Sequence, residues 1–516
     1  MFRTRRLIAI AAAAAASLGL LASCADSSSP QADGSQDGDA GTLTLYSFTE
    51  PTSWDPAGFG ESPYLPYALA VYDTLFVIGA DGQVTPKLAS GYEYNDDRTE
   101  LTLALEEGIA FDDGTPFDAA AVKANIEHFQ AFATPAGPLL QHVADATVVD
   151  DETVQLTLSQ PDPGLLFSLT QAAGLMGNPN TLGTDEIARE PDGTGPYTLD
   201  AQGSVQGSQY VFDRKDEYWG QDYPYSTVTY SVFPDEVARL NAFASGQIQY
   251  AHTTTAAAAI DARDAVADAT MQDTAVTWEG LFFFDRDGEL QPELEDPRVR
   301  EALALAIDAD AMIETIRGGY GEATDQIFSP TMDAFDDALE GSHDYDPERA
   351  KQLLGDAGYP DGFTLPWPRT GTILPEIYTA ISQYWNEIGV TTDDVQWGPG
   401  EAVASIMAGD FGVVYFSNLQ LLDTWSVIQL SVAPDTQYNP FGSETSELNE
   451  LIEELQFAAD DERAAAGQAV NEYLVENHWF APLYRPAMFY LTAPEISLTV
   501  QPGYVQPPIW AFAPAS

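Results

Sequence analysis

Short segments in which apolar and polar residues alternate are interleaved with longer amphipathic segments along most of this chain. Alternation is typical of a strand with one buried face, and apolar residues three to four apart are typical of a helix. The predicted strands are 42–46, 101–105, 154–158, 228–232, 393–397, 413–416 and 482–490. The predicted helices are 115–129, 234–246, 296–306, 346–357, 377–388, 446–458 and 461–476. This interleaving predicts an α/β fold, and 516 residues predict two or more lobes.

Capping residues mark the ends of several predicted helices. Thr115 is expected to cap the first helix, with Pro116 in its first turn. Asp346 precedes Pro347 at the start of a later helix, and Gly358 follows its last turn. These local signals predict helix boundaries without any knowledge of tertiary packing.

The charge balance excludes whole classes of partner. The chain has 20 Lys and Arg against 80 Asp and Glu, a formal net charge of −60. Such a surface repels nucleic-acid phosphates and anionic lipid head groups, so neither nucleic-acid binding nor electrostatic membrane binding is expected. Solubility is the simpler explanation of the charge, and selection of cationic ligands is the alternative.

The first 24 residues have the pattern of an export signal. Three arginines precede an apolar run, Leu7 to Leu21, that is too short and too rich in alanine for a membrane span. Leu21-Ala22-Ser23-Cys24 resembles a bacterial lipobox, which implies cleavage before Cys24 and a diacylglycerol on its thiol. The alternative is a plain secretory signal with an incidental cysteine. Residues 24–41 lack aromatic and branched aliphatic residues and are expected to form a flexible tether.

Searches for catalytic and metal-binding motifs find none. Cys24 is the one cysteine, which excludes an intrachain disulfide and a cysteine-based zinc site. The five histidines are too far apart in sequence for a local metal motif, and no nucleophile elbow, His-Glu-x-x-His helix or phosphate loop is present. No cofactor or metal is therefore expected. Carboxylates alone never exclude a secreted glycoside hydrolase, which remains the enzyme alternative.

Several motifs resemble the extracellular solute-binding proteins of family 5, which serve peptide- and nickel-type ABC importers. Each motif is weak alone, but together they follow the order of the family from about residue 42 to 490. They are Trp54-Asp55-Pro56, Val71-Tyr72-Asp73-Thr74-Leu75, Phe111-Asp112-Asp113-Gly114-Thr115-Pro116, Gly193-Thr194-Gly195-Pro196-Tyr197, Tyr218-Trp219-Gly220, Asp296-Pro297-Arg298-Val299-Arg300 and Tyr345-Asp346-Pro347.

The resemblance implies a periplasmic-binding-protein-like fold with two lobes, a subdomain inserted in lobe I and a two-strand hinge near 278–285 and 479–486. Lobe I is expected to comprise 42–75, the inserted subdomain 76–190, the segment 191–283 and the C-terminal return 484–516. Lobe II is expected to span 284–483. Residues 1–23 are the expected lipoprotein signal peptide, before the tether.

The resemblance also implies a function. The protein is expected to be a lipid-anchored, monomeric binding protein on the extracytoplasmic face of the cell membrane, and not an enzyme. It would capture a peptide or similar solute between its lobes and deliver it to an ABC permease with a partner ATPase. Oligosaccharides and metal chelates are alternative ligands within the same family.

Candidate ligand-binding residues are those expected in loops at the lobe interface. In lobe I they follow the first strand, and in lobe II they follow predicted strands. They are Thr49, Glu50, Trp54, Arg369, Trp397, Asn418, Asp423 and Trp425. In peptide-binding relatives an aspartate in the Asp423 region receives the ligand ammonium, and a basic residue in the Arg369 region receives its carboxylate. The alternatives are a helix N-cap for Asp423, a surface ion pair for Arg369 and core positions for Trp397 and Trp425.

Overall fold

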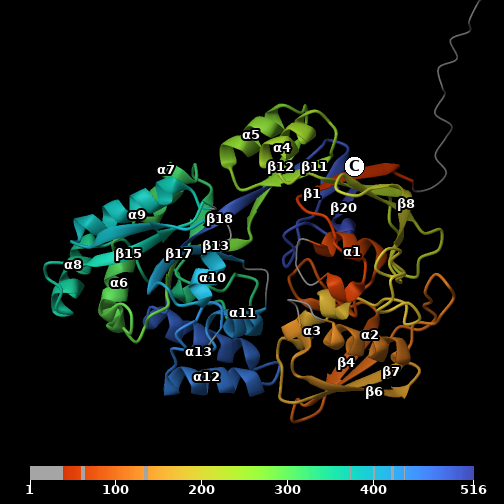
Figure 1. Cartoon of the computed structure of the whole chain (residues 1–516), viewed down its shortest axis with the longest axis horizontal. Helices are drawn as coiled ribbons and strands as arrows, with labels where there is room; N and C mark the ends of the chain where they lie inside the picture. The colour runs from red at the N-terminus through yellow and green to blue at the C-terminus, as the bar shows by residue number, and fades with distance from the viewer. Residues whose placement is uncertain are drawn as a thin grey trace, which may run out of the picture. The chain divides into compact units, whose positions relative to one another are not determined.

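The computed structural model describes residues 39–59, 64–132, 137–371, 373–398, 401–419, 423–434 and 436–516. The predicted signal peptide, Cys24 and most of the predicted tether lie outside these residues. Contacts group Ala40–Ser516 into one compact unit. Strands and helices alternate through this unit, so the predicted α/β fold is confirmed (Figure 1).

The first core of the unit is built from both ends of the chain. Its buried residues run from Leu43 to Val276 and resume from Ala487 to Phe512. A four-stranded sheet, in the order β1-β10-β9-β8, forms its centre, and only the β1–β10 pair is parallel. We call this part lobe I. The elements around this sheet are β1 (Thr42–Ser47), α1 (Leu65–Val71), β8 (Tyr197–Val205), β9 (Gln209–Arg214), β10 (Thr227–Val232), α4 (Glu236–Ala244), β11 (Tyr250–Thr253), α5 (Ala256–Asp264), β12 (Thr270–Ala275), β19 (Ile496–Leu498) and β20 (Phe512–Pro514).

A second sheet of lobe I is antiparallel, in the order β4-β5-β7-β6, and helix α2 packs on it. Leu101 and Leu103 of β5 and Val154 and Leu156 of β7 are fully buried, as the alternation in the sequence predicts. The elements of this part are β2 (Phe76–Ile78), β3 (Val84–Pro86), β4 (Ala89–Tyr94), β5 (Glu100–Leu105), α2 (Ala119–Ala131), β6 (Val143–Asp150), β7 (Thr153–Leu158) and α3 (Leu165–Ser168).

The predicted start of α2 is wrong by one turn. Asp118, not Thr115, is the N-cap, and its carboxylate accepts a hydrogen bond from Ala121 N at 2.9 Å. Thr115 N instead donates to Asp113 within a turn, and Pro116 forms an isolated β-bridge with Ala110. The helix starts later because the segment before it is held by that bridge.

Two further cores lie between Trp278 and Tyr484, and we call this part lobe II. Asp296 and Asp346 cap α6 and α8, as predicted, and Gly358 adopts a left-handed φ of 97° after α8. The elements are β13 (Thr277–Phe283), α6 (Pro297–Leu305), α7 (Ala309–Ile316), β14 (Gly321–Ala323), α8 (Pro347–Asp356), β15 (Thr364–Arg369), α9 (Pro375–Glu387), β16 (Thr391–Gln396), α10 (Glu401–Met407), β17 (Val413–Leu419), α11 (Thr424–Ser431), α12 (Ser446–Phe457), α13 (Arg463–Glu476) and β18 (Phe480–Thr492).

Two lengths of chain cross between the lobes. β12 continues into β13 at Val276, and β18 runs through 13 residues from lobe II to lobe I. The first half of β18 pairs with β13 and β14, and its second half pairs with β11 and β12. Figure 1 shows β18 passing from β13 and β17 toward β11. The two crossing segments form one continuous sheet with β11 and β17, which is the geometry of a hinge.

A buried carboxylate ties four segments of lobe I together. Asp73 is 1% exposed and forms an ion pair with Lys87 at 3.1 Å. Tyr218 Oη and Trp219 Nε1 donate to it at 2.9 and 2.8 Å, and Thr194 Oγ1 donates at 3.1 Å. The motifs around Asp73, Thr194 and Tyr218, which carry the resemblance to the family in the sequence, therefore meet at one structural site.

Within the described ranges, no helix has both the length and the apolar character needed to cross a membrane.

Candidate ligand-binding site between the lobes

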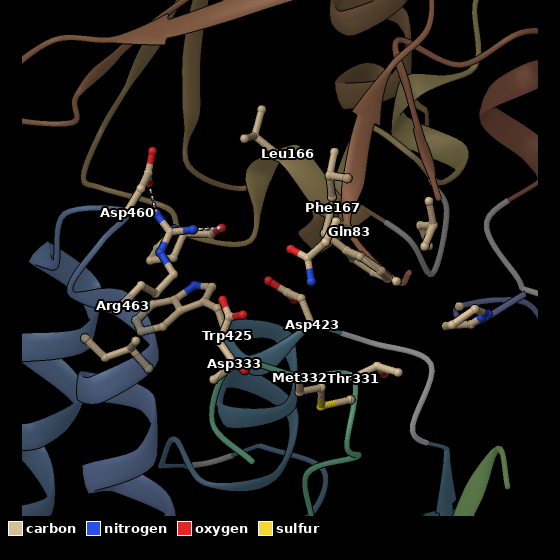
Figure 2. A pocket seen from close by; sticks show the side chains of 18 of the residues that line it. Gln83, Leu166, Phe167, Thr331, Met332, Asp333, Asp423, Trp425, Asp460 and Arg463 are labelled. Carbon is tan, nitrogen blue, oxygen red and sulfur yellow. Dashed lines mark hydrogen bonds and ion pairs between the residues drawn. The ribbon is translucent and has the colours of Figure 1, made fainter. Parts of the chain in front are cut away.

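Several pockets are lined by residues of both lobes, among them one of about 640 Å³ bordered by Asp273, Glu322 and Arg485 and one of about 410 Å³ beside Arg98 and Asp460. Two others, which we call the smaller and the larger pocket, lie beside Asp423 and beside Glu279. The smaller pocket has a volume of about 270 Å³ and is shown in Figure 2. The larger pocket has a volume of about 520 Å³ and lies beside the crossing strands. Ligand pockets usually span about 300–1,000 Å³, so the larger pocket has the size expected for a small solute and the smaller pocket is below it.

The wall of the larger pocket contains a buried ion pair. Arg317 Nη2 contacts Glu279 Oε2, and the two side chains are 9% and 8% exposed. Tyr415 Oη donates to the same carboxylate oxygen at 2.8 Å, and Tyr484 Oη lies 2.9 Å from Tyr415 Oη. Burial, with Glu279 as the second cause, raises the pKa of Tyr484 to about 12, so this phenol keeps its proton at neutral pH.

Local chain geometry explains why Glu279 and Arg317 meet. The β13–β18 register shifts between Glu279 and Gly280, and a Cβ on Gly280 would lie 2.2 Å from Ala481 O. Only glycine allows this close approach of the strands. Arg317 ends α7, and Gly318 and Gly319 then adopt left-handed φ angles of 69° and 81°. The glycine pair turns the chain sharply after Arg317, which leaves the arginine at the pocket wall.

Arg317 retains unused hydrogen-bonding capacity. Its Nε atom is buried and has no partner among the described residues. Burial lowers the pKa of Arg317, but the Glu279 carboxylate and the neighbouring tyrosines outweigh it, and the net shift is upward. The guanidinium is therefore charged, and because Nε is buried, a ligand oxygen in the pocket would meet the terminal Nη groups instead.

Neutral side chains form the rest of the larger pocket. The described lining residues other than Glu279 and Arg317 carry no charge. Hydroxyl groups of both lobes and apolar groups share this wall. They are Thr254, Thr255, Thr277, Thr315, Ser417, Val276, Ile316, Ile373, Leu374, Phe416, Pro486 and Met488, with Ala256, Ala257, Gly318 and Ala487. The arrangement suits a solute with polar oxygens and an apolar group.

The smaller pocket brings together two of the predicted residues, Asp423 and Trp425. Figure 2 shows Gln83 and Phe167 of lobe I on one side and Asp423 and Trp425 of lobe II on the other. Asp423 is the N-cap of α11, and its Oδ1 accepts a hydrogen bond from Ser426 N at 3.0 Å. Burial raises the pKa of Asp423.

Direct contacts between the lobes surround the smaller pocket. Asp460 Oδ1 binds Arg98 of lobe I at 3.0 Å and Arg463 of lobe II at 2.9 Å. Gln456 Nε2 donates to Pro161 O at 2.9 Å. Burial, with the charge of Asp423 as a smaller contribution, raises the pKa of Asp162 to about 6. The smaller pocket is thus part of a contact surface between the lobes.

The other lobe I candidates have partners within the protein. Glu50 accepts hydrogen bonds from Gly207 N and Tyr210 Oη, each at 2.6 Å. Trp54 is buried against Phe59, Tyr67, Tyr210 and Phe212. Tyr67 Oη donates to Thr49 O at 2.9 Å. These contacts hold the three residues in place without a ligand, and their role as ligand contacts stays a prediction.

The remaining lobe II candidates, Arg369, Asn418 and Trp397, are not among the described residues that line the larger pocket. Arg369 pairs with Asp394 at 2.7 Å, and Asn418 is buried next to Ser417. Trp397 is buried against Phe411. The loop after β15 and the end of β17, where ligand contacts were expected, supply Ile373, Leu374, Phe416 and Ser417 to the pocket. The sequence analysis did not predict Thr254, Thr255, Glu279 and Arg317. For Glu279 a signal was available, because it is a lone acid in the apolar strand Trp278-Glu279-Gly280-Leu281.

Asp423→Asn separates the two roles of Asp423. Asparagine caps helices about as well as aspartate, so the capping contact predicts a stability and a peptide affinity close to those of the wild type. The ligand-ammonium role predicted from the sequence instead requires about ten- to hundredfold weaker binding of a peptide with a free amine. Calorimetric titration of both proteins with a free-amine peptide and its N-acetylated form decides between them.

In the part of the chain that the structure describes, no group of three or more His, Cys, Asp or Glu side chains is arranged to hold a metal ion.

Curated relatives are similar in sequence to most of this chain. The glutathione-binding protein GsiB of Salmonella paratyphi A is 29% identical over 374 residues, 69% of each chain. GsiB of Escherichia coli O157:H7 is 27% identical over 371 residues, again 69% of each chain.

Solved structures share the fold. HbpA2 from Haemophilus parasuis superimposes with a TM-score of 0.79 at 18% identity, covering 92% of this chain and 100% of its own. The Helicobacter pylori binding protein DppA in complex with the peptide STSA gives 0.74 at 19% identity, covering 92% and 98%. The two-lobed, periplasmic-binding-protein-like fold predicted from the sequence is thereby confirmed.

A family model matches residues 83–426, which is more than half of the chain. This range includes the Asp73-linked motif at Thr194, the first crossing segment, formed by β12 and β13, and the residues Glu279 and Arg317. The model describes the middle region of its family. The chain therefore belongs to the bacterial extracellular solute-binding proteins, family 5.

Proposed function

We propose that this chain captures a small peptide-like solute in the pocket beside Glu279 and Arg317. Members of family 5 are binding proteins of ABC importers and not enzymes, and they act outside the cytoplasm. The lining of the 520 Å³ pocket supports this ligand class, because it combines one charged guanidinium with hydroxyl groups and apolar side chains. The relatives that bind glutathione, and the structural neighbour that holds the peptide STSA, support the same class.

The pocket offers complementary contacts for a short peptide. Peptide carbonyl oxygens accept hydrogen bonds, which Arg317 and the hydroxyls of Thr255 and Ser417 can donate. An apolar peptide side chain would rest against Phe416 and Met488. Histidine and cysteine are absent from the described lining residues, so a peptide fits this wall better than a metal ion bound through protein ligands.

Closure of the lobes would bury the ligand. The crossing strands supply the hinge, and the contacts of Asp460 and Gln456 with lobe I supply part of the closed interface. Exposed ion pairs contribute only about 0–1 kcal/mol each, so ligand contacts must provide most of the free energy of closure. The closed protein would then deliver the solute to a membrane permease and its ATPase.

A tripeptide library tests the proposal. Incubation of the protein with the library, followed by gel filtration and mass spectrometry, is expected to recover intact peptides bound to the protein. Recovery of none, or recovery of cleaved peptides in proportion to protein concentration, would contradict the proposed function. Oligosaccharides serve as the competing ligand class in a parallel incubation.

We further propose that Cys24 carries the lipid anchor. It is the one cysteine of the chain and follows Leu21-Ala22-Ser23. Cys24→Ser removes the thiol that lipidation needs, so the protein is expected to move from the membrane fraction to the soluble fraction. Fractionation followed by immunoblotting measures this, with Ser23→Ala as the matched control. Full membrane retention of Cys24→Ser would exclude the anchor.

A further inference from the structure

Glu279 and Arg317 are the charged residues among the described residues that line the larger pocket, and they neutralise one another. The chain segments next to the lining, Thr372 and Gln420 to Leu422, lie outside the described residues and carry no charge in the sequence. The described lining of the larger pocket therefore carries no net charge, although the chain has a formal net charge of −60.

The carboxylate of Glu279 is fixed in place. It accepts hydrogen bonds from Tyr415 Oη at 2.8 Å and Tyr484 Oη at 3.4 Å, in addition to its contact with Arg317. These three donors come from β17, β18 and the end of α7. A buried carboxylate with three donors cannot turn away from the pocket to make room for a second anion.

From this geometry we infer that Glu279 is a specificity-determining residue that excludes carboxylates from the position beside Arg317. This inference rests on the proposed function, because it concerns the group of the bound peptide that Arg317 receives. A ligand carboxylate on Arg317 would lie on the same guanidinium as Glu279, and two carboxylates at that separation repel strongly in a partly desolvated site. A neutral carbonyl or amide oxygen accepts a hydrogen bond from the Arg317 guanidinium without this repulsion.

The inference names a substrate class. The pocket selects peptides whose residue beside Arg317 is uncharged, and it rejects those with Asp, Glu or a terminal carboxylate at that position. In the absence of Glu279, the same arginine would attract a carboxylate and form a charge-assisted pair with it. One side chain thus decides between a site for neutral peptides and a site for anionic ones.

Tripeptides that differ only by Asn or Asp test this selection. The probes are Asn-Leu-Leu, Leu-Asn-Leu and Leu-Leu-Asn with their Asp counterparts, titrated by calorimetry. The wild type is expected to bind one Asn peptide at least tenfold more tightly than its Asp counterpart. Glu279→Gln retains an oxygen acceptor for the tyrosines and removes the charge. In this variant, the affinity for that Asp peptide divided by the affinity for its Asn counterpart, the Asp-to-Asn ratio, is expected to be at least tenfold higher than in the wild type.

The matched control is Glu348→Gln. Glu348 is an exposed acid of lobe II on α8, so its replacement changes the net charge equally and is expected to leave the ratio unchanged. An equal rise in both variants would indicate a long-range charge effect and overturn the role of Glu279. An unchanged ratio in Glu279→Gln would overturn it as well.

Different results contradict the proposed function and the role of Glu279. If no probe binds the wild type, the proposed function is contradicted, and the inference falls with it. If probes bind and only the ratio stays constant, the role of Glu279 alone is contradicted. Should Glu279→Gln unfold, the charge-free pair Glu279→Gln/Arg317→Met replaces it, and its Asp-to-Asn ratio is expected to approach one; a ratio that stays at the wild-type value would overturn the inference.

Discussion

Replacing Asp73 with alanine is expected to lower the free energy of unfolding by about 3–5 kcal/mol, because it removes one partner of a buried ion pair. The change leaves the Lys87 ammonium, whose side chain is 15% exposed, without its carboxylate. It also removes the acceptor of the Tyr218, Trp219 and Thr194 hydrogen bonds. Urea denaturation followed by tryptophan fluorescence measures the difference.

The matched control is Asp185→Ala. Asp185 is an exposed acid of lobe I, and surface substitutions of this kind usually change stability by less than about 0.5 kcal/mol. A second comparison is Asp73→Asn combined with Lys87→Met, which removes both charges and is expected to recover part of the loss. Equal stability of Asp73→Ala and Asp185→Ala would show that the Asp73 network does not hold lobe I together.

Replacing Arg317 with methionine is expected to weaken binding of a library-selected tripeptide by about ten- to hundredfold. The loss corresponds to about 1.5–3 kcal/mol for a hydrogen bond from a charged donor. The same change leaves Glu279 buried without its cation, so it also lowers stability. Calorimetric titration gives the affinity, and thermal unfolding gives the stability.

The double variant Glu279→Gln/Arg317→Met separates these two effects. It carries no buried charge at this position, so stability is expected to return toward that of the wild type while the affinity stays low. Lys351→Met removes the same charge from the exposed surface of α8 and is expected to change neither quantity. Wild-type affinity in the double variant would show that Arg317 makes no contact with the peptide.

Local signals predicted much of the fold. Asp296 and Asp346 cap their helices because capping depends on residues within one turn. Thr115 is not the cap, because Pro116 forms a β-bridge and Asp118 takes the capping position. Both outcomes depend on packing with neighbouring segments, which local sequence signals do not report. The order of strands in the crossing sheet, where β18 pairs with four strands far away in sequence, has no local signal.

The candidate site was harder to predict than the fold. The sequence indicated the strand ends that border the pocket, and Ser417 and Ile373 lie within a few residues of the predicted Asn418 and Arg369. Glu279 is one of 80 acids, and nothing in its neighbours shows that a bulge at Gly280 directs it toward Arg317, 38 residues later. The large apolar surfaces of Trp54 and Trp397 are buried in the cores, which agrees with the core alternative for Trp397, and their role as ligand contacts stays a prediction.

Protection of a single introduced cysteine tests most directly where the ligand binds. Since Cys24 is the one natural cysteine, Cys24→Ser/Ser417→Cys has a unique thiol in the larger pocket, and Cys24→Ser/Thr331→Cys has one at the smaller pocket. Maleimide labelling of each protein is followed with and without a saturating tripeptide from the library. Binding in the larger pocket predicts that the peptide slows labelling at position 417 at least tenfold more than at position 331, which closure of the lobes alone would shield. Protection at 331 with free labelling at 417 would contradict the account.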